Sequence, residues 1–149
     1  MLPLVGFLKQ GITAKKLAMA VSVGLIFGIF PVLGSTTIIC AVMAMLFRVN
    51  QPAVQLVNYL VYPLQLIFIM PYIKIGEIIF KAQHAASYSI TNMLIMFRQD
   101  AANAFHVMGQ SMLYAIVAWA FTAPFLGMVI YFSLLPVFKK ILLNKNTSL

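Results

Sequence analysis

The chain has 149 residues, of which 63% are hydrophobic and only 8% are charged, whereas a typical soluble domain is about 25% charged. These few charged side chains cannot cover the surface of a soluble fold. The composition therefore excludes an ordinary soluble protein and predicts a single membrane domain over residues 1–149. The formal net charge of +8 predicts contact with lipid headgroups and not with nucleic acid, because lysines flank the first and last apolar runs: Lys9, Lys15, Lys16, Lys139, Lys140 and Lys145.

The first apolar run extends from Leu17 to Phe47 without a charged residue. As one helix it would be about 46 Å long, which exceeds a hydrocarbon core of about 30 Å, whereas two complete spans need about 40 residues. At its centre Pro31 disfavours helix at the preceding residue, Gly34 permits a turn and Ser35 offers an N-cap. The run therefore predicts a hairpin of two short helices, which is either re-entrant or a pair of short spans.

The second apolar run, from Val49 to Ile73, is long enough to cross a membrane with some tilt. Pro52 suits the first turn of its helix, because the missing N–H would have no partner there. Pro63 and Pro71 predict interruptions further along. The tyrosines suit either a membrane interface or a neighbouring helix: Tyr59, Tyr62 and Tyr72.

Residues 78–111 interleave most of the remaining polar side chains with apolar ones, a pattern typical of amphipathic helices lying at a membrane interface. Residues 112–138 form the last apolar run, which is about one span long and ends near Pro136. Inside it, Pro124–Gly127 echoes Pro31–Gly34. Breaks at matching places in two halves can mark a transporter repeat, although helix kinks without a function are the default explanation.

The charges also predict a topology. Both termini lie in the cytoplasm, the first hairpin enters from that side, and one outward and one inward crossing follow. The stretch from Lys74 to Ser111 then lies outside, where its three basic and two acidic residues sum to only +1. That weak charge is compatible with the preference of positive residues for the cytoplasmic side.

An ordered set of motifs occupies the chain from Gly11 to Glu77. They are Gly11-Ile-Thr before a basic pair, Gly24 and Gly28, Phe30-Pro31-Val-Leu-Gly34 with Thr36-Thr37, Phe47-Arg48-Val-Asn50, Pro63, and Tyr72 with Gly76. In this order they resemble the bacterial membrane family called domain of unknown function 2062 (DUF2062). The resemblance implies a multi-pass protein of the bacterial inner (cytoplasmic) membrane. Some family members look fused to glycosyltransferase domains, which implies work with lipid-linked sugars.

The break in the first run is the first candidate site. Backbone N–H groups at the start of a half-helix carry partial positive charge and can bind an anion, with hydroxyls as further donors. Arg48 ends the same helix, and its planar guanidinium suits a phosphate. In the alternative reading, the hydroxyls only cap the helix and Arg48 anchors its end by snorkelling. The candidates for substrate binding here are Gly34, Ser35, Thr36, Thr37, Arg48 and Asn50.

Asn58 and Gln65 complete the candidate set. They lie seven residues apart on the second run, close to two helical turns, so they project from a similar face. Polar side chains at such depth usually join helices together, and lining a substrate path is the alternative. Both readings turn the two side chains away from lipid.

The other reactive residues predict no catalytic or metal site. His84, His106, Glu77 and Asp100 do not follow the i, i+4 spacing of helical metal ligands, and local ion pairs with nearby lysines explain Glu77. Cys40 inside an apolar run is a small buried hydrophobe. Because the sequence has no Gly-rich phosphate loop, nucleophile elbow or paired carboxylates, we expect neither an enzyme nor a cofactor.

The leading expectation is a small membrane protein that binds or translocates an anionic lipid-like or lipid-linked substrate at the broken hairpin. Four short segments enclose little volume, so a homo-oligomer is expected. The alternative is a non-transporting scaffold or accessory subunit for envelope glycosyltransferases, which uses its helix faces to hold a partner.

Overall fold

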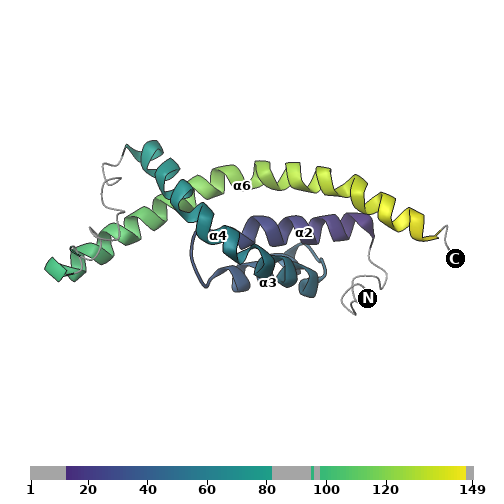
Figure 1. The fold of residues 1–149 in the computed structure, drawn as a ribbon, viewed down its shortest axis with the longest axis horizontal. Helices are drawn as coiled ribbons and strands as arrows, with labels where there is room; N and C mark the ends of the chain where they lie inside the picture. Colours follow the sequence, from purple (N-terminus) through teal and green to yellow (C-terminus); the bar gives the residue numbers. More distant parts are fainter. Residues whose placement is uncertain (1–12, 82–94, 96–97, 147–149) are drawn as a thin grey trace.

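The computed structural model describes residues 13–81, 95 and 98–146, with side chains up to residue 143. Four helices longer than two turns occupy these residues, and no strand is present among them (Figure 1). The prediction of an all-helical chain is therefore confirmed for the described part. Most of residues 82–97, within the predicted interfacial segment, lie outside it.

The first apolar run forms two short helices, as its length predicted. Helix α2 spans Ala14–Gly28 and begins at Thr13, whose hydroxyl accepts a hydrogen bond from the Lys16 N–H at 3.3 Å. Helix α3 spans Thr36–Leu46. They are about 22 Å and 16 Å long at 1.5 Å per residue, so each is shorter than a hydrocarbon core of about 30 Å.

The second run forms α4, Gln51–Phe80, which is longer than predicted. Pro52 lies in its first turn, as expected, and the Asn50 side chain caps it by accepting from the Ala53 N–H at 2.9 Å. The predicted interruptions at Pro63 and Pro71 are wrong, because the helix continues through both. Both rings are on the exposed side of α4, and helices of membrane proteins tolerate proline where the freed backbone groups find other partners.

The last helix, α6, spans Ala101–Asn146 and is about 69 Å long. The sequence placed a change from interfacial to membrane-spanning helix after Ser111, but α6 runs through this point without a break. It also continues through Pro124 and past Pro136, where the last run was expected to end. The echo between Pro124–Gly127 and Pro31–Gly34 is therefore not structural, since only the earlier segment is non-helical.

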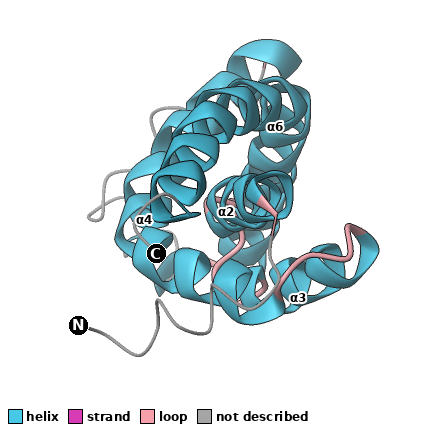
Figure 2. Cartoon of the chain, turned by 90° about the vertical axis from the view of Figure 1, so that its right-hand side faces the viewer, coloured by secondary structure: helices cyan, strands magenta, loops and turns pink. Residues whose placement is uncertain are grey.

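Helix α2 is the centre of the fold, with α3, α4 and α6 packed around it (Figure 2). Its contact with α4 depends on two glycines. A Cβ atom added to Gly24 would lie 2.7 Å from Val57 Cβ and 2.8 Å from the Val54 carbonyl oxygen, and one added to Gly28 would lie 3.3 Å from Asn58 Oδ1. This Gly-x-x-x-Gly spacing lets two helix backbones approach closely.

Two clusters of buried side chains hold the helices together. One joins α2, α3 and α4 through small residues that include Ala20, Ala44 and Ala53, and Cys40 is a fully buried member of it, as predicted. The other joins α4, α6 and the segment before α3, and it contains the buried Tyr72. Of the three tyrosines on α4, Tyr72 therefore faces a neighbouring helix, whereas Tyr59 and Tyr62 are exposed.

Helices α4 and α6 cross far from the start of α2 and the end of α6 (Figure 1). Gly76 lies directly against the backbone of Tyr114 there, so that an added Cβ would lie 2.8 Å from Tyr114 Cβ. The rings of Phe80 and Tyr114 stack beside this point with centroids 4.8 Å apart. Beyond the crossing the two helices diverge (Figure 1).

Two helices are long and apolar enough to cross a membrane, α4 and the Ala101–Leu143 part of α6. The start of α2 and the end of α6 lie at the same end of the molecule, and the break between α2 and α3 lies further along its length (Figure 1). Helices α2 and α3 are two short helices joined by a turn, and they pack against each other.

Candidate functional site

The break between α2 and α3 is fixed by a side chain of α4. Gln65 is fully buried, and its Nε2 donates to the carbonyl oxygen of Phe30 at 2.7 Å and to that of Val32 at 3.4 Å. Gly34 completes the turn with a φ of 83°, in the left-handed region that favours glycine. The prediction of a turn at Gly34 is therefore confirmed, and Gln65 holds the turn in place.

The hydroxyl groups of the break do not act as predicted. Ser35 occupies the N-cap position of α3 but makes no capping hydrogen bond, and its hydroxyl instead donates back to the Val32 carbonyl oxygen at 2.9 Å. Thr36 is buried and Thr37 is exposed, so the two point in different directions. The Thr37 carbonyl oxygen accepts from Gln55 Nε2 at 2.9 Å, which joins α3 to α4.

Asn58 and Gln65 both point from α4 toward the hairpin and are at least 98% buried. Asn58 lies against Gly28, and its Nδ2 donates to Gln55 Oε1 at 3.3 Å. The prediction that both side chains turn away from the outer surface is confirmed. Their oxygens, Asn58 Oδ1 and Gln65 Oε1, have no hydrogen-bond partner among the described residues.

Arg48 and Asn50 lie at the other end of α3 from the break. The eleven residues of α3 separate them from Thr36 by about 16 Å. Arg48 is exposed and has a φ of 50°, while the Asn50 side chain serves as the N-cap of α4. The eight candidate residues therefore form two groups, and the structure does not bring Arg48 to the hydroxyl groups of the break.

Sequence reasoning missed a groove between α2 and α6. Its volume is about 580 Å³ and its walls are almost entirely apolar. From α2 and the end of α3 it is lined by Met19, Ser22, Val23, Ile26, Phe27 and Phe47. From α6 it is lined by Trp119, Ala120, Ala123, Pro124, Gly127, Met128 and Tyr131. The small residues of α6 were a visible signal for a groove on this helix. The residues of the opposite wall lie about a hundred positions away in the sequence, so the sequence did not show that the two walls face each other.

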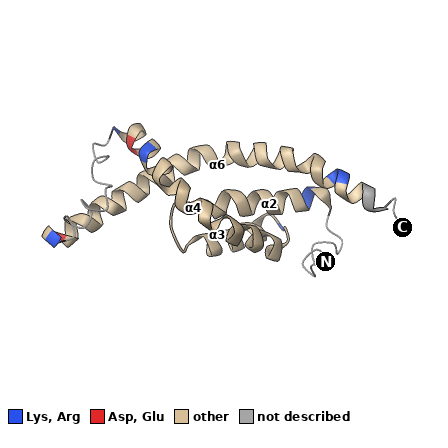
Figure 3. Ribbon diagram, in the orientation of Figure 1, with Lys and Arg blue, Asp and Glu red and all other residues tan. Residues whose placement is uncertain are grey.

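One end of this groove opens toward basic residues. Lys15 and Lys16 lie within about one helical turn of Met19 on α2, and the exposed Arg48 directly follows Phe47. Lys139 and Lys140 lie further along α6 at the same end, where Figure 3 shows the basic residues of both helices. An apolar groove that ends at positive charge has the general form of a site for an anionic amphiphile.

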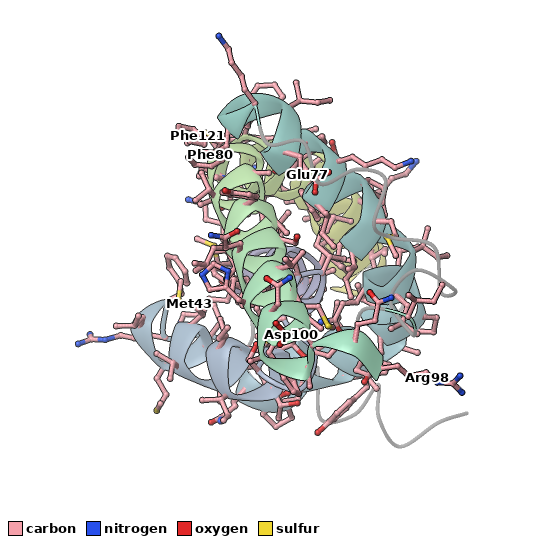
Figure 4. All side chains as sticks on the ribbon, turned by 90° about the vertical axis from the view of Figure 1, so that its left-hand side faces the viewer. Met43, Glu77, Phe80, Arg98, Asp100 and Phe121 are labelled. Carbon is pink, nitrogen blue, oxygen red and sulfur yellow. The ribbon has the colours of Figure 1, made fainter. Side chains whose placement is uncertain are left out.

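The opposite end of the molecule has mixed charge. Glu77 on α4 is 3% exposed and lies between α4 and α6, as Figure 4 shows from that end, whereas Lys74 and Lys81 are exposed. Arg98 and Asp100 are exposed near the start of α6. His106 is exposed on α6, while His84 lies outside the described residues. Within the described part, no three His, Cys, Asp or Glu residues are grouped so that they could hold a metal ion.

A family profile for "Uncharacterized protein conserved in bacteria (DUF2062)" matches residues 4–146. The chain belongs to the DUF2062 family. The resemblance found between Gly11 and Glu77 is thus confirmed, and it extends through α6 almost to the end of the chain. No curated protein and no solved structure matches this DUF2062 chain. The groove and the break both lie within the matched residues, so the site belongs to the part of the chain that the family shares.

Proposed function

We propose that this chain is a multi-pass protein of the bacterial inner membrane that binds an anionic lipid, with one hydrocarbon chain in the α2–α6 groove. The observation that carries the proposal is the combination of an apolar groove of about 580 Å³ with the exposed residues Lys15, Lys16 and Arg48 near one of its ends. A lipid headgroup with a phosphate would meet these charges, and its chain would meet the apolar walls.

Placement in a membrane is supported by the outer surface of the helices. Leu60 on α4 and Phe121 on α6 are 72% and 75% exposed, and Ile38 on α3 is 69% exposed. Such large apolar side chains around a fold of this size suit a hydrocarbon surrounding. The basic end is assigned to the cytoplasm because Lys and Arg favour that side. Both termini are then cytoplasmic, and the α2–α3 hairpin is re-entrant.

The dimensions of the groove fit one leaflet of the bilayer. Its wall on α6 extends from Trp119 to Tyr131, a rise of about 18 Å. Half of a hydrocarbon core is about 15 Å. A lipid from the cytoplasmic leaflet could therefore place its chain along the groove while its headgroup stays near Arg48.

The contacts at the break favour this site over the predicted one. The Ser35 hydroxyl already donates to the Val32 carbonyl oxygen, and both Gln65 donor contacts go to carbonyl oxygens. The first backbone N–H groups of α3 remain donors at the break, but no Lys or Arg lies between Ile29 and Thr37, and Asn58 and Gln65 present acceptor oxygens there. The break therefore supports the hairpin, and we assign the anion to the basic end.

The proposal is tested by mass spectrometry of the lipids that stay bound after gentle purification. Gly127→Leu should project into the groove and reduce retained lipid, whereas Gly127→Ala should leave it unchanged, since an added Cβ lies at an ordinary 3.6 Å from Ile26 Cγ1. Arg48→Gln should weaken binding of anionic lipid about fivefold, from about 1 kcal/mol per basic residue near a lipid surface. The control is Lys74→Gln, which removes one exposed charge at the other end.

Equal lipid retention by the wild type and Gly127→Leu would overturn the groove assignment. An equal effect of Arg48→Gln and Lys74→Gln would overturn the headgroup assignment. The competing role is a scaffold for an envelope glycosyltransferase. A copurifying glycosyltransferase without retained lipid would support that role and contradict lipid binding.

A further inference from the structure

Trp119 lines the α2–α6 groove at its inner end. This residue lies at the limit of the groove that is farthest from the basic residues, opposite Phe27 at the last turn of α2. Its Nε1–H donates to the Ile26 carbonyl oxygen at 3.1 Å. That oxygen belongs to the last turn of α2, where carbonyl groups lack helical partners, so the indole ring satisfies one of them.

Two aromatic rings fix the orientation of the indole. The Trp119 ring packs edge-on against Phe27, with centroids 5.5 Å apart, and against Phe30, with centroids 4.9 Å apart and planes at 89°. Edge-to-face pairs at these separations are favourable. Phe30 lies in the break and its carbonyl oxygen is held by Gln65. The wall at the end of the groove is therefore attached to α2, to the break and, through Gln65, to α4.

We propose that Trp119 sets the length of the hydrocarbon chain that the groove accepts. The inference rests on the proposed lipid binding and adds the class of lipid to it. The groove wall on α6 rises about 18 Å from Trp119 to Tyr131, slightly more than half of a hydrocarbon core of about 30 Å. One acyl chain laid along this wall, with its headgroup near Arg48, would therefore end at Trp119.

A fixed wall gives binding a defined dependence on chain length. Each methylene that moves from water into the groove raises affinity about fourfold, from about 0.8 kcal/mol per buried methylene. Once the chain reaches Trp119 this gain stops, because the next methylene has no apolar wall to contact. Affinity should therefore rise with chain length up to the wall and then level off or fall.

The experiment measures binding of a series of single-chain alkyl phosphates of increasing length to the purified full chain. Trp119→Ala opens the end of the groove and should move the affinity maximum to longer chains, with about a fourfold gain for each added methylene that enters. Ala123→Leu fills the groove one helical turn from Trp119 on the side of the basic end, and should move the maximum to shorter chains. Trp119→Phe keeps an aromatic wall and should give a small shift toward longer chains.

Phe121→Ala is the matched control, because Phe121 is an aromatic residue of the same helix that is 75% exposed and does not line the groove (Figure 4). It should leave the maximum in place. If Trp119→Ala fails to fold, Trp119→Phe and Ala123→Leu decide the question through their opposite shifts. A maximum that stays in place in Trp119→Phe and Ala123→Leu overturns the inference.

The outcomes also separate the inference from the proposed function. A wild type that binds every chain length equally, and loses binding in Gly127→Leu, keeps lipid binding but removes the role of Trp119. A wild type that binds no member of the series, and retains no lipid on purification, overturns both.

Discussion

Gly24→Ala tests the close approach of α2 to α4, on which the central position of α2 depends. The added Cβ would lie 2.7 Å from Val57 Cβ and 2.8 Å from the Val54 carbonyl oxygen. Ordinary contacts begin at 3.4 Å, so the two helices must separate by about 0.7 Å at this point. Valine is stiff about χ1 and the carbonyl belongs to the helix backbone, so neither neighbour can move aside alone.

The magnitude follows from two opposing effects. Overpacking a well-packed contact costs about 1–3 kcal/mol, while replacing a helix-interior glycine with alanine returns up to about 1 kcal/mol. Gly109→Ala, in α6, isolates the second effect because no atom lies within 4 Å of its added Cβ. We expect Gly109→Ala to be neutral or stabilising, and Gly24→Ala to be less stable than Gly109→Ala by about 1–3 kcal/mol.

The assay measures equilibrium unfolding in detergent micelles for the wild type and the two variants under identical conditions, with circular dichroism as the signal. The difference between the variants cancels the gain in helix propensity and measures the overpacking alone. Equal stability of Gly24→Ala and Gly109→Ala would refute the close contact between α2 and α4.

Three further predictions concern the hairpin. Gly34→Ala should lower the free energy of unfolding by about 1–2 kcal/mol in the same assay. The Gly34 φ is 83° and an added Cβ has open space around it, so the loss comes from the backbone conformation alone. An unchanged free energy of unfolding would contradict this turn. Gln65→Leu should cost about 1–3 kcal/mol, because the carbonyl oxygens of Phe30 and Val32 lose a buried donor. Gln65→Glu should lower the free energy of unfolding further at neutral pH, and this stability should recover as the pH falls, since only the protonated carboxyl group can donate to these oxygens. A loss of stability that does not depend on pH would exclude this contact. The thiol of Cys40 is fully buried and should react with maleimide only after denaturation, whereas fast labelling of the native protein would show that α3 does not pack as described.

The hairpin could be predicted from the sequence because the length of the first apolar run fits neither one membrane span nor two. Helical rise and bilayer thickness are fixed quantities, so the run from Leu17 to Phe47 had to be divided. Pro31 and Gly34 then marked the position of the division, and Pro52 marked the start of the next helix. These signals are local, which is why they could be read in order along one chain.

The prolines of the other helices show that a proline in the sequence does not by itself predict a helix break. Pro31 is buried next to a glycine turn, whereas Pro63, Pro71 and Pro124 are exposed on continuous helices. Whether proline breaks a helix depends on what surrounds the freed carbonyl group, and neighbouring helices decide that.

The groove could not be predicted, because its two walls come from helices that are far apart in the sequence. Its shape depends on the distance and the angle between these helices. Gly24 and Gly28 were a usable signal for close helix packing, but they identify α4 as the partner only once the fold is known. Arg48 was predicted to act together with the hydroxyl groups of the break, but helix α3 separates it from them, and the sequence alone did not show this separation.

The crossing of α4 and α6 at Gly76 and Tyr114 also has a mechanical meaning. Because the two backbones touch there, the crossing sets the direction in which α6 runs toward the basic end. Gly127 lies thirteen residues beyond Tyr114, or about 20 Å along α6. A difference of about 5° in the crossing angle therefore corresponds to about 2 Å in the position of Gly127, so Gly76 sets the spacing of α2 and α6 at a distance.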